Sequence, residues 1–113
     1  MFLFGRQPLI VGYKHGEVNL MEGTGDIAIG QVVKSGAGRD KGNIFLILGI
    51  IDYKYVYIVD GEMRKISNPK KKKINHLIIY NTVFIEFQDK IKNGEKINNA
   101  YVRKLLEPFK KML

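Results

Sequence analysis

The residues best suited to chemistry lie in one glycine-rich loop, residues 34–43, with the sequence KSGAGRDKGN. Glycine is needed where the backbone takes a positive φ or closely approaches a bulky group, and three glycines within seven residues indicate several such positions. Backbone amides in such a turn form a concave site for a phosphate oxygen, and Lys34, Arg39 and Lys41 supply positive charge. The alternative is a mobile hairpin loop that its charges keep solvated. Asp40, between two cations, is expected to fix the loop through a local ion pair or an amide hydrogen bond.

A second basic segment covers residues 64–76, RKISNPKKKKINH. Six cations fall within ten residues and are interrupted by Asn68 and Pro69. We therefore expect this segment to face solvent or a polyanion and not to form a buried strand. A run of charges is usually a solvated face. Contact with a polyanion becomes the better interpretation if this segment and the glycine-rich loop meet on one rim of the fold.

The balance of charge favours nucleic acid as the partner. The net charge is +8, and residues 30–76 carry ten cations against four acids. Such a concentrated field attracts polyanions, of which nucleic acid is the commonest and an anionic membrane surface the second. No apolar run approaches the roughly 20 residues that span a membrane, so we expect no membrane partner. The chain has no cysteine, which fits a reducing cytoplasm.

Enzymatic alternatives have little support in the sequence. The run at residues 23–28, GTGDIA, matches a dinucleotide-binding fingerprint in form, but no predicted strand precedes it and no helix follows it. Lys41 is followed by glycine, where a phosphate-binding loop needs a hydroxyl residue. His15 and His76 are far apart and lack a carboxylate cluster. We expect no catalytic residue, metal or cofactor, and we expect His76 at a strand edge, where packing or an RNA contact is favoured over acid–base chemistry.

The elements that position these loops are predicted to be short strands. From residue 29 on, brief apolar stretches alternate with turn signals, which is typical of a small all-β unit. Asp60 and Gly61 form a strong hairpin signal. A small barrel is expected, since closure removes the exposed edges of short strands. The predicted strands cover residues 29–34, 44–51, 55–60, 63–66 and 74–79, and the second of them is apolar enough to be buried on both faces.

Two short helices are predicted after the strands, because the apolar period changes to that of a helix beyond Asn81. Gly94 is expected to end the first helix, and Asn98 or Asn99 to cap the second. Pro108 should end the second helix or bend its last turn. The predicted division is an extension over residues 1–28, a barrel over 29–80 and a helical tail over 81–113. The predicted apolar stripes are Phe84, Phe87 and Ile91 in the first helix and Val102, Leu105, Leu106 and Phe109 in the second.

Three tyrosines, Tyr53, Tyr55 and Tyr57, lie on or beside the third predicted strand. Such rings stack on unpaired bases in many RNA-binding proteins. Tyrosine on a half-buried strand is more often simply packed against its neighbours. Both interpretations remain open at this point.

Residues 30–50, GQVVKSGAGRDKGNIFLILGI, resemble a KOW motif, the short β-hairpin unit of ribosomal and transcription-associated proteins. GRDKGN takes the place of the cationic loop, although Ile44 stands where many such loops carry a further glycine. The wider span of residues 29–77 is similar to the barrel domain of large-subunit ribosomal proteins of the fourteen-e, six-e and twenty-seven-e type. The similarity lies in AGRDKG, in IIDYKYVYIVDGEMRK and in the basic run leading to INHL.

This resemblance implies a mainly β fold, with a small SH3-like five-stranded barrel followed by two short C-terminal helices. It implies a non-enzymatic cytoplasmic protein that contacts the phosphate backbone of structured ribosomal RNA. The alternative is a protein-interaction module in a transcription or translation complex. The oligomeric state stays open. The predicted RNA-contacting residues are Lys34, Ser35, Gly36, Gly38, Arg39, Lys41, Gly42, Asn43, Arg64, Lys65, Lys70, Lys71, Lys72, Lys73 and His76.

Overall fold

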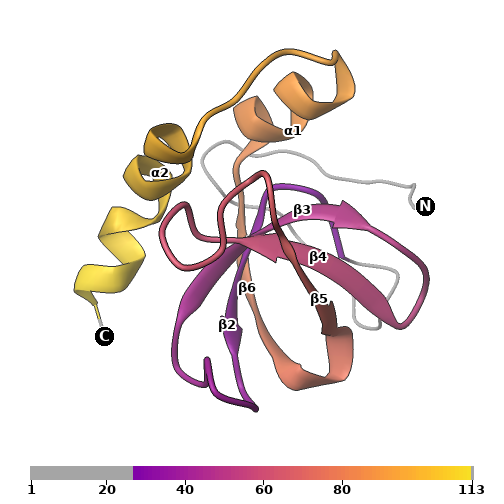
Figure 1. The fold of residues 1–113 in the computed structure, drawn as a ribbon, viewed down its shortest axis with the longest axis vertical. Coiled ribbons are helices and arrows are strands. Elements are labelled where there is room, and N and C mark those ends of the chain that lie inside the picture. Colours follow the sequence, from indigo (N-terminus) through magenta and orange to yellow (C-terminus); the bar gives the residue numbers. More distant parts are fainter. Residues whose placement is uncertain (1–26, 113) are drawn as a thin grey trace.

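The computed structural model describes residues 27–112, which form a five-stranded antiparallel sheet followed by two helices (Figure 1). The predicted mainly β class and the two C-terminal helices are confirmed. The predicted N-terminal extension lies almost entirely outside the described residues. The elements are β2 (Gln31–Ser35), β3 (Ile44–Ile50), β4 (Tyr55–Val59), β5 (Lys70–Lys73), the 3-10 helix η3 (Ile74–His76), β6 (Leu77–Val83), α1 (Ile85–Lys92) and α2 (Asn99–Lys111).

The sheet has the order β5-β4-β3-β2-β6, and all neighbouring strands are antiparallel. β2 pairs with both β3 and β6, so the last strand returns beside the first. The register shifts between Gln31 and Val33 and again between Ile47 and Gly49. Irregularities of this kind bend a strand and increase its twist, and they help the sheet to curl into a small barrel-like fold.

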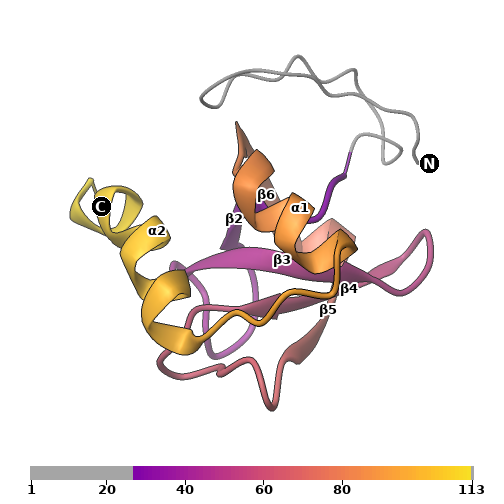
Figure 2. The same ribbon diagram turned by 90° about the horizontal axis from the view of Figure 1, so that it is seen from above.

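Apolar side chains are buried on both sides of the sheet. The inner cluster contains Val33, Phe45 and Ile58, and η3 adds Ile74 to it. The outer cluster lies between the sheet and the helices, where Leu46 and Val59 pack with residues of α1 and α2. Both helices pack into this cluster, α1 through Phe87 and α2 through Val102 and Leu106. Figure 2 shows α1 over β3 and α2 beside one end of that strand. The prediction that this strand is buried on both faces is confirmed for residues 44–47.

The helices begin and end close to the predicted signals. The Asn98 side chain caps α2 by accepting a hydrogen bond from the Tyr101 amide at 2.8 Å. Gly94 has a φ of 71°, as expected of a glycine just beyond a helix. α2 does not end at Pro108 but continues to Lys111. The proline ring removes the amide that would otherwise bond to the Lys104 carbonyl, and α2 ends within one turn of it.

The predicted fourth strand is wrong. Residues 63–66 form part of a long connection, and the strand that pairs with β4 is the lysine run itself, Lys70–Lys73. The Asp60–Gly61 pair does turn the chain, because Asp60 Oδ1 accepts hydrogen bonds from the amides of Glu62 and Arg64. It does not make a tight hairpin. The predicted fifth strand begins at Leu77 and not at Ile74, since Ile74 belongs to η3.

Candidate nucleic-acid interface

The glycine-rich loop joins β2 to β3, and its glycines serve the loop's own geometry. Gly38 and Gly42 have φ values of 90° and 92°, which other residues adopt only with strain. Gly36 donates its amide to the His76 carbonyl at 2.8 Å, and a Cβ at this glycine would lie 3.3 Å from that oxygen. The amides of Lys41 and Gly42 bond to carbonyls within the same segment. These three amides are therefore engaged within the protein and are not available to a phosphate.

Asp40 fixes the loop, but its partners are not the neighbouring cations that the sequence suggested. Its Oδ1 accepts hydrogen bonds from Ser35 Oγ at 2.7 Å and from Lys72 Nζ at 2.9 Å. Its Oδ2 forms an ion pair with Lys70 Nζ at 3.2 Å, without the geometry of a hydrogen bond. Lys72 also donates to the Ala37 carbonyl at 2.8 Å. We call Asp40, Lys70, Lys72 and Ser35 the Asp40 cluster.

The centre of the Asp40 cluster is nearly closed to solvent, since the side chains of Asp40 and Lys72 are each 7% exposed, whereas that of Lys70 is 29% exposed. Burial alone would raise the pKa of Asp40. Hydrogen bonds from Lys72 and Ser35, with the nearby Lys70 ammonium, outweigh that effect and lower the pKa from 3.8 to about 2. The carboxylate is ionised at neutral pH and holds the loop against β5.

The lysine run is divided between the two faces of β5, because successive side chains of a strand point to opposite sides. Lys70 and Lys72 lie opposite the inner-cluster residues Ile58 and Val56 and turn toward Asp40. Lys71 and Lys73 lie opposite Tyr57 and Tyr55 and point to the outer face. The run does form a strand, contrary to the expectation, but Lys72 is its only buried residue, and Asp40 neutralises the inward-pointing pair.

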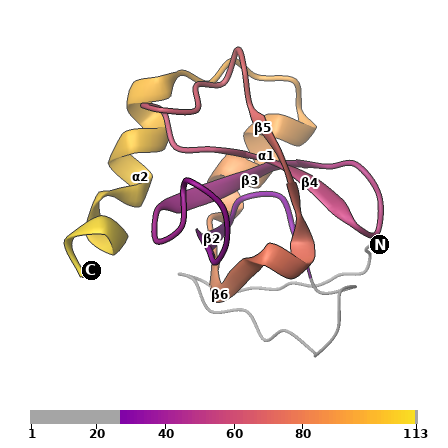
Figure 3. The same ribbon diagram turned by 60° about the horizontal axis from the view of Figure 1, so that its bottom comes forward.

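The structure brings the two predicted basic segments together, as the Asp40 cluster joins the loop to β5 (Figure 3). Arg39 and Lys41 are exposed beside the cluster, and Lys34 is half-buried on β2. Ser35 and Lys72 are buried, so their polar atoms are directed into the protein and not toward a ligand. The remaining predicted contacts lie in the same loop, in the β4–β5 connection, in β5 and in η3. The exposed ones are Gly36, Gly38, Lys65, Lys71 and His76. The half-buried ones are Gly42, Asn43, Arg64, Lys70 and Lys73.

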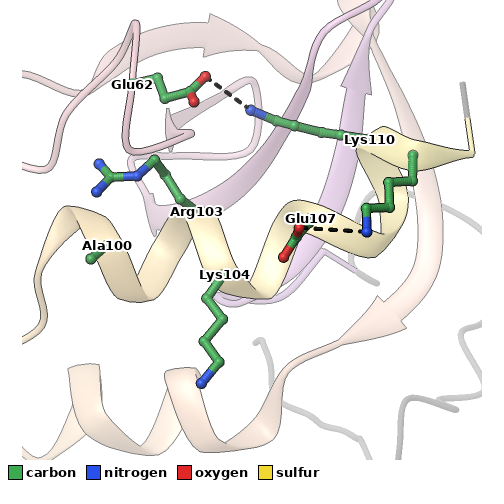
Figure 4. A pocket seen from close by; sticks show the side chains of 7 residues that line it. Glu62, Ala100, Arg103, Lys104, Glu107 and Lys110 are labelled. Carbon is green, nitrogen blue, oxygen red and sulfur yellow. Dashed lines mark hydrogen bonds and ion pairs between the residues drawn. The ribbon is translucent and has the colours of Figure 1, made fainter.

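The connection between β4 and β5 reaches both the loop and α2. Asn43 Nδ2 lies 3.8 Å from Met63 Sδ, and Arg103 of α2 donates to the Gly61 carbonyl at 2.8 Å. Beside this contact, a shallow pocket of about 470 Å³ runs along α2 (Figure 4). An ion pair joins Glu62 to Lys110 across it, and a second joins Glu107 to Lys111 along α2. Its lining carries both signs of charge, so it is a poorer anion site than the loop.

Neither a metal site nor a membrane-spanning helix is found between residues 27 and 112. In that range no three His, Asp or Glu side chains gather so that they could hold a metal ion. No helix in the same range has the length and apolar character needed to cross a bilayer.

The fold and the site define a small basic protein of barrel-like architecture, in which a buried ion cluster supports an exposed cationic loop. No protein-family model matches the chain. Over 73 residues, which are 65% of this chain and 99% of the relative, it is 36% identical to the "Putative ribosome-binding protein YbzG" of Bacillus subtilis (strain 168). The chain belongs to the family of that protein.

Proposed function

We propose that this protein binds the ribosome in the cytoplasm, by contacting phosphates of ribosomal RNA and without catalysing a reaction. The observation that carries the proposal is the joining of the two basic segments by the Asp40 cluster. The relationship to a protein named as ribosome-binding supports the ribosome as the partner. A KOW-type role, in which the loop between β2 and β3 lies on RNA, is part of this proposal.

The Asp40 cluster prepares the loop for a polyanion. Arg39 and Lys41 flank Asp40, so their side chains extend from a backbone that is already fixed. A loop ordered before binding loses less conformational entropy when it meets its ligand. Arg39 is suited to paired hydrogen bonds with phosphate oxygens, and Lys41 contributes a compact charge. Lys72 and Ser35 act on the RNA only indirectly, through the loop.

The test is co-sedimentation of the full chain with purified ribosomes over a range of KCl concentrations. If Arg39 and Lys41 each neutralise one phosphate, the double variant R39A/K41A should reduce the slope of log affinity against log salt by about 2. The matched control is K92A/K96A, which removes two exposed lysines at the end of α1 and just beyond it and should leave the slope unchanged.

Two results would contradict the proposal. One is an absence of co-sedimentation at low salt, and the other is an R39A/K41A slope equal to that of the wild type. Digestion with ribonuclease separates RNA binding from the alternative of a protein-interaction module. RNA binding requires the partner to be lost on digestion, whereas a retained partner would favour protein contact in a translation or transcription complex.

A further inference from the structure

The outer face of β4 and β5 is left uncovered by the helices. Val59, at the end of β4, packs in the outer cluster under α1 and α2. Two residues earlier on the same face, Tyr57 is 41% exposed, and Tyr53 in the β3–β4 turn is 75% exposed. Tyr57 lies beside Gly49, whose Cβ position is 3.9 Å from the ring, so a flat backbone supports the ring from one side.

Three lysines lie beside the tyrosines of β4 and of the turn before it. In the antiparallel register, Lys71 lies opposite Tyr57 and Lys73 lies opposite Tyr55. The Lys71 ammonium is 4.6 Å from the centre of the Tyr55 ring, and the Lys54 ammonium is 5.6 Å from that of Tyr53. Tyr55 is half-buried, so Tyr53 and Tyr57 are the more exposed of the three rings.

Asp52, an acid of the β3–β4 turn beside this face, has a structural task. Asp52 Oδ1 accepts hydrogen bonds from the amides of Lys54 and Tyr55, each at 2.8 Å, and so closes the β3–β4 turn. Lys54, Lys71 and Lys73 carry three positive charges, and Asp52 carries one negative charge. These residues together therefore have a net positive charge. We call the outer-face residues Tyr57, Lys71 and Lys73, together with Tyr53 and Lys54 of the adjoining β3–β4 turn, the tyrosine face.

We infer that the tyrosine face binds unpaired nucleotides of an RNA strand, with Tyr53 and Tyr57 stacking on bases while the lysines neutralise phosphates. This inference deepens the proposed ribosome binding and rests on it for the identity of the RNA. An acidic peptide would satisfy the lysines but would gain little from two exposed rings. A duplex presents phosphates but keeps its bases stacked inside. A single strand uses both features of this face, because every base has a planar surface and every nucleotide a phosphate.

The test measures binding of the full chain to a fluorescently labelled oligouridine of about 12 nucleotides, a length typical of single-strand sites, by anisotropy. Y53L/Y57L removes the rings and keeps apolar bulk, and we expect its affinity to fall about tenfold or more. Y53F/Y57F keeps the rings and loses only the hydroxyls, so it should bind like the wild type. Circular dichroism and thermal melting establish that both variants fold.

Three outcomes would overturn the inference: equal affinities of the leucine and phenylalanine variants for oligouridine, no binding by the wild type, or a glutamate peptide of equal length that binds as tightly and depends equally on the rings. Ribosome co-sedimentation of Y53L/Y57L separates the two proposals. If that variant still sediments as the wild type does while oligouridine binding shows no dependence on the rings, only the tyrosine face loses its function. If the wild type fails to sediment while oligouridine binding requires the rings, the ribosome proposal falls and stacking stands.

Discussion

The Asp40 carboxylate receives two hydrogen bonds and an ion pair, and two of its three partners are lysines. Burying such charges costs desolvation energy, which good geometry must repay. Removing one partner leaves the other charge buried and unpaired, which is far more costly than losing a surface ion pair. Two neighbouring lysines of one run therefore have different roles: Lys72 stabilises the fold, and Lys71 lies on the tyrosine face.

The stability of the protein should depend on pH through Asp40. Its pKa of about 2 in the folded state is below the ordinary 3.8, so the ionised form favours folding. The contribution is fully present above pH 4 and is lost as the pH falls toward 2, and it amounts to about 2 kcal/mol. Urea denaturation followed by circular dichroism should show this loss in the wild type. In D40N, the free energy of unfolding should not show this decrease between pH 4 and pH 2. The same decrease in both proteins would contradict the role of Asp40.

Lys72 and Lys71 should differ sharply when each is replaced by methionine, which keeps the length of the side chain. K72M leaves Asp40 buried without its closest cation, so we expect the free energy of unfolding to fall by about 3 kcal/mol. K71M removes an exposed charge and should cost less than about 0.5 kcal/mol. The measurement is urea denaturation at pH 7. Equal losses would mean that the Asp40 cluster does not stabilise the fold.

At the scale of elements, the sequence predicts β2, β3 and β4 well because each places apolar residues on a face that becomes buried. β5 could not be predicted in this way. Its four side chains are all lysines, and it forms a strand only because β4 pairs with it and Asp40 receives its inward charges. A signal was nevertheless present: Lys70 and Lys72 share one side of an extended chain, and Asp40 is the sole acid of the glycine-rich loop.

The β4–β5 connection should depend on Gly61. This residue has a φ of 80°, and a Cβ there would lie 2.5 Å from the Asn99 carbonyl oxygen and 2.9 Å from Arg103 Cγ. Gly94 also has a positive φ, but nothing lies within 4 Å of its Cβ position. We expect G94A to cost about 1 kcal/mol from the backbone alone, and G61A to cost at least about 2 kcal/mol because α2 must also shift. Thermal melting of both variants checks this, and equal losses would contradict the close packing of α2.

For the molecule as a whole, β3 forms the centre because it lies between the inner and the outer clusters. The helices complete the second of these clusters, since Val102 and Leu106 are fully buried against the sheet. From the sequence, RNA binding could be predicted only on the condition that the two basic segments lie together, and the sequence could not establish that they do. Whether they lie together depends on the order of the strands and on the side of β5 that faces the loop. Neither can be predicted from a local sequence pattern.

The sheet and the helices should unfold together. L106A removes a side chain with no solvent exposure, and we expect it to lower the free energy of unfolding by about 3 kcal/mol. The exposed Lys104 on the same helix provides the control, and K104A should change stability little. In L106A the helical signal in the far ultraviolet and the tyrosine signal in the near ultraviolet should disappear at the same urea concentration. Loss of the helical signal at a lower concentration would show that the helices form a separate unit.

The Asp40 cluster also imposes an order on biosynthesis. Lys72 is added to the growing chain 32 residues after Asp40. The chain therefore contains the glycine-rich segment before the lysines that pair with Asp40 have been synthesised. Until then the aspartate has no buried ammonium to pair with, and the contact that holds the loop against β5 cannot form. A newly made copy can therefore complete the Asp40 cluster only after β5 has emerged from the exit tunnel.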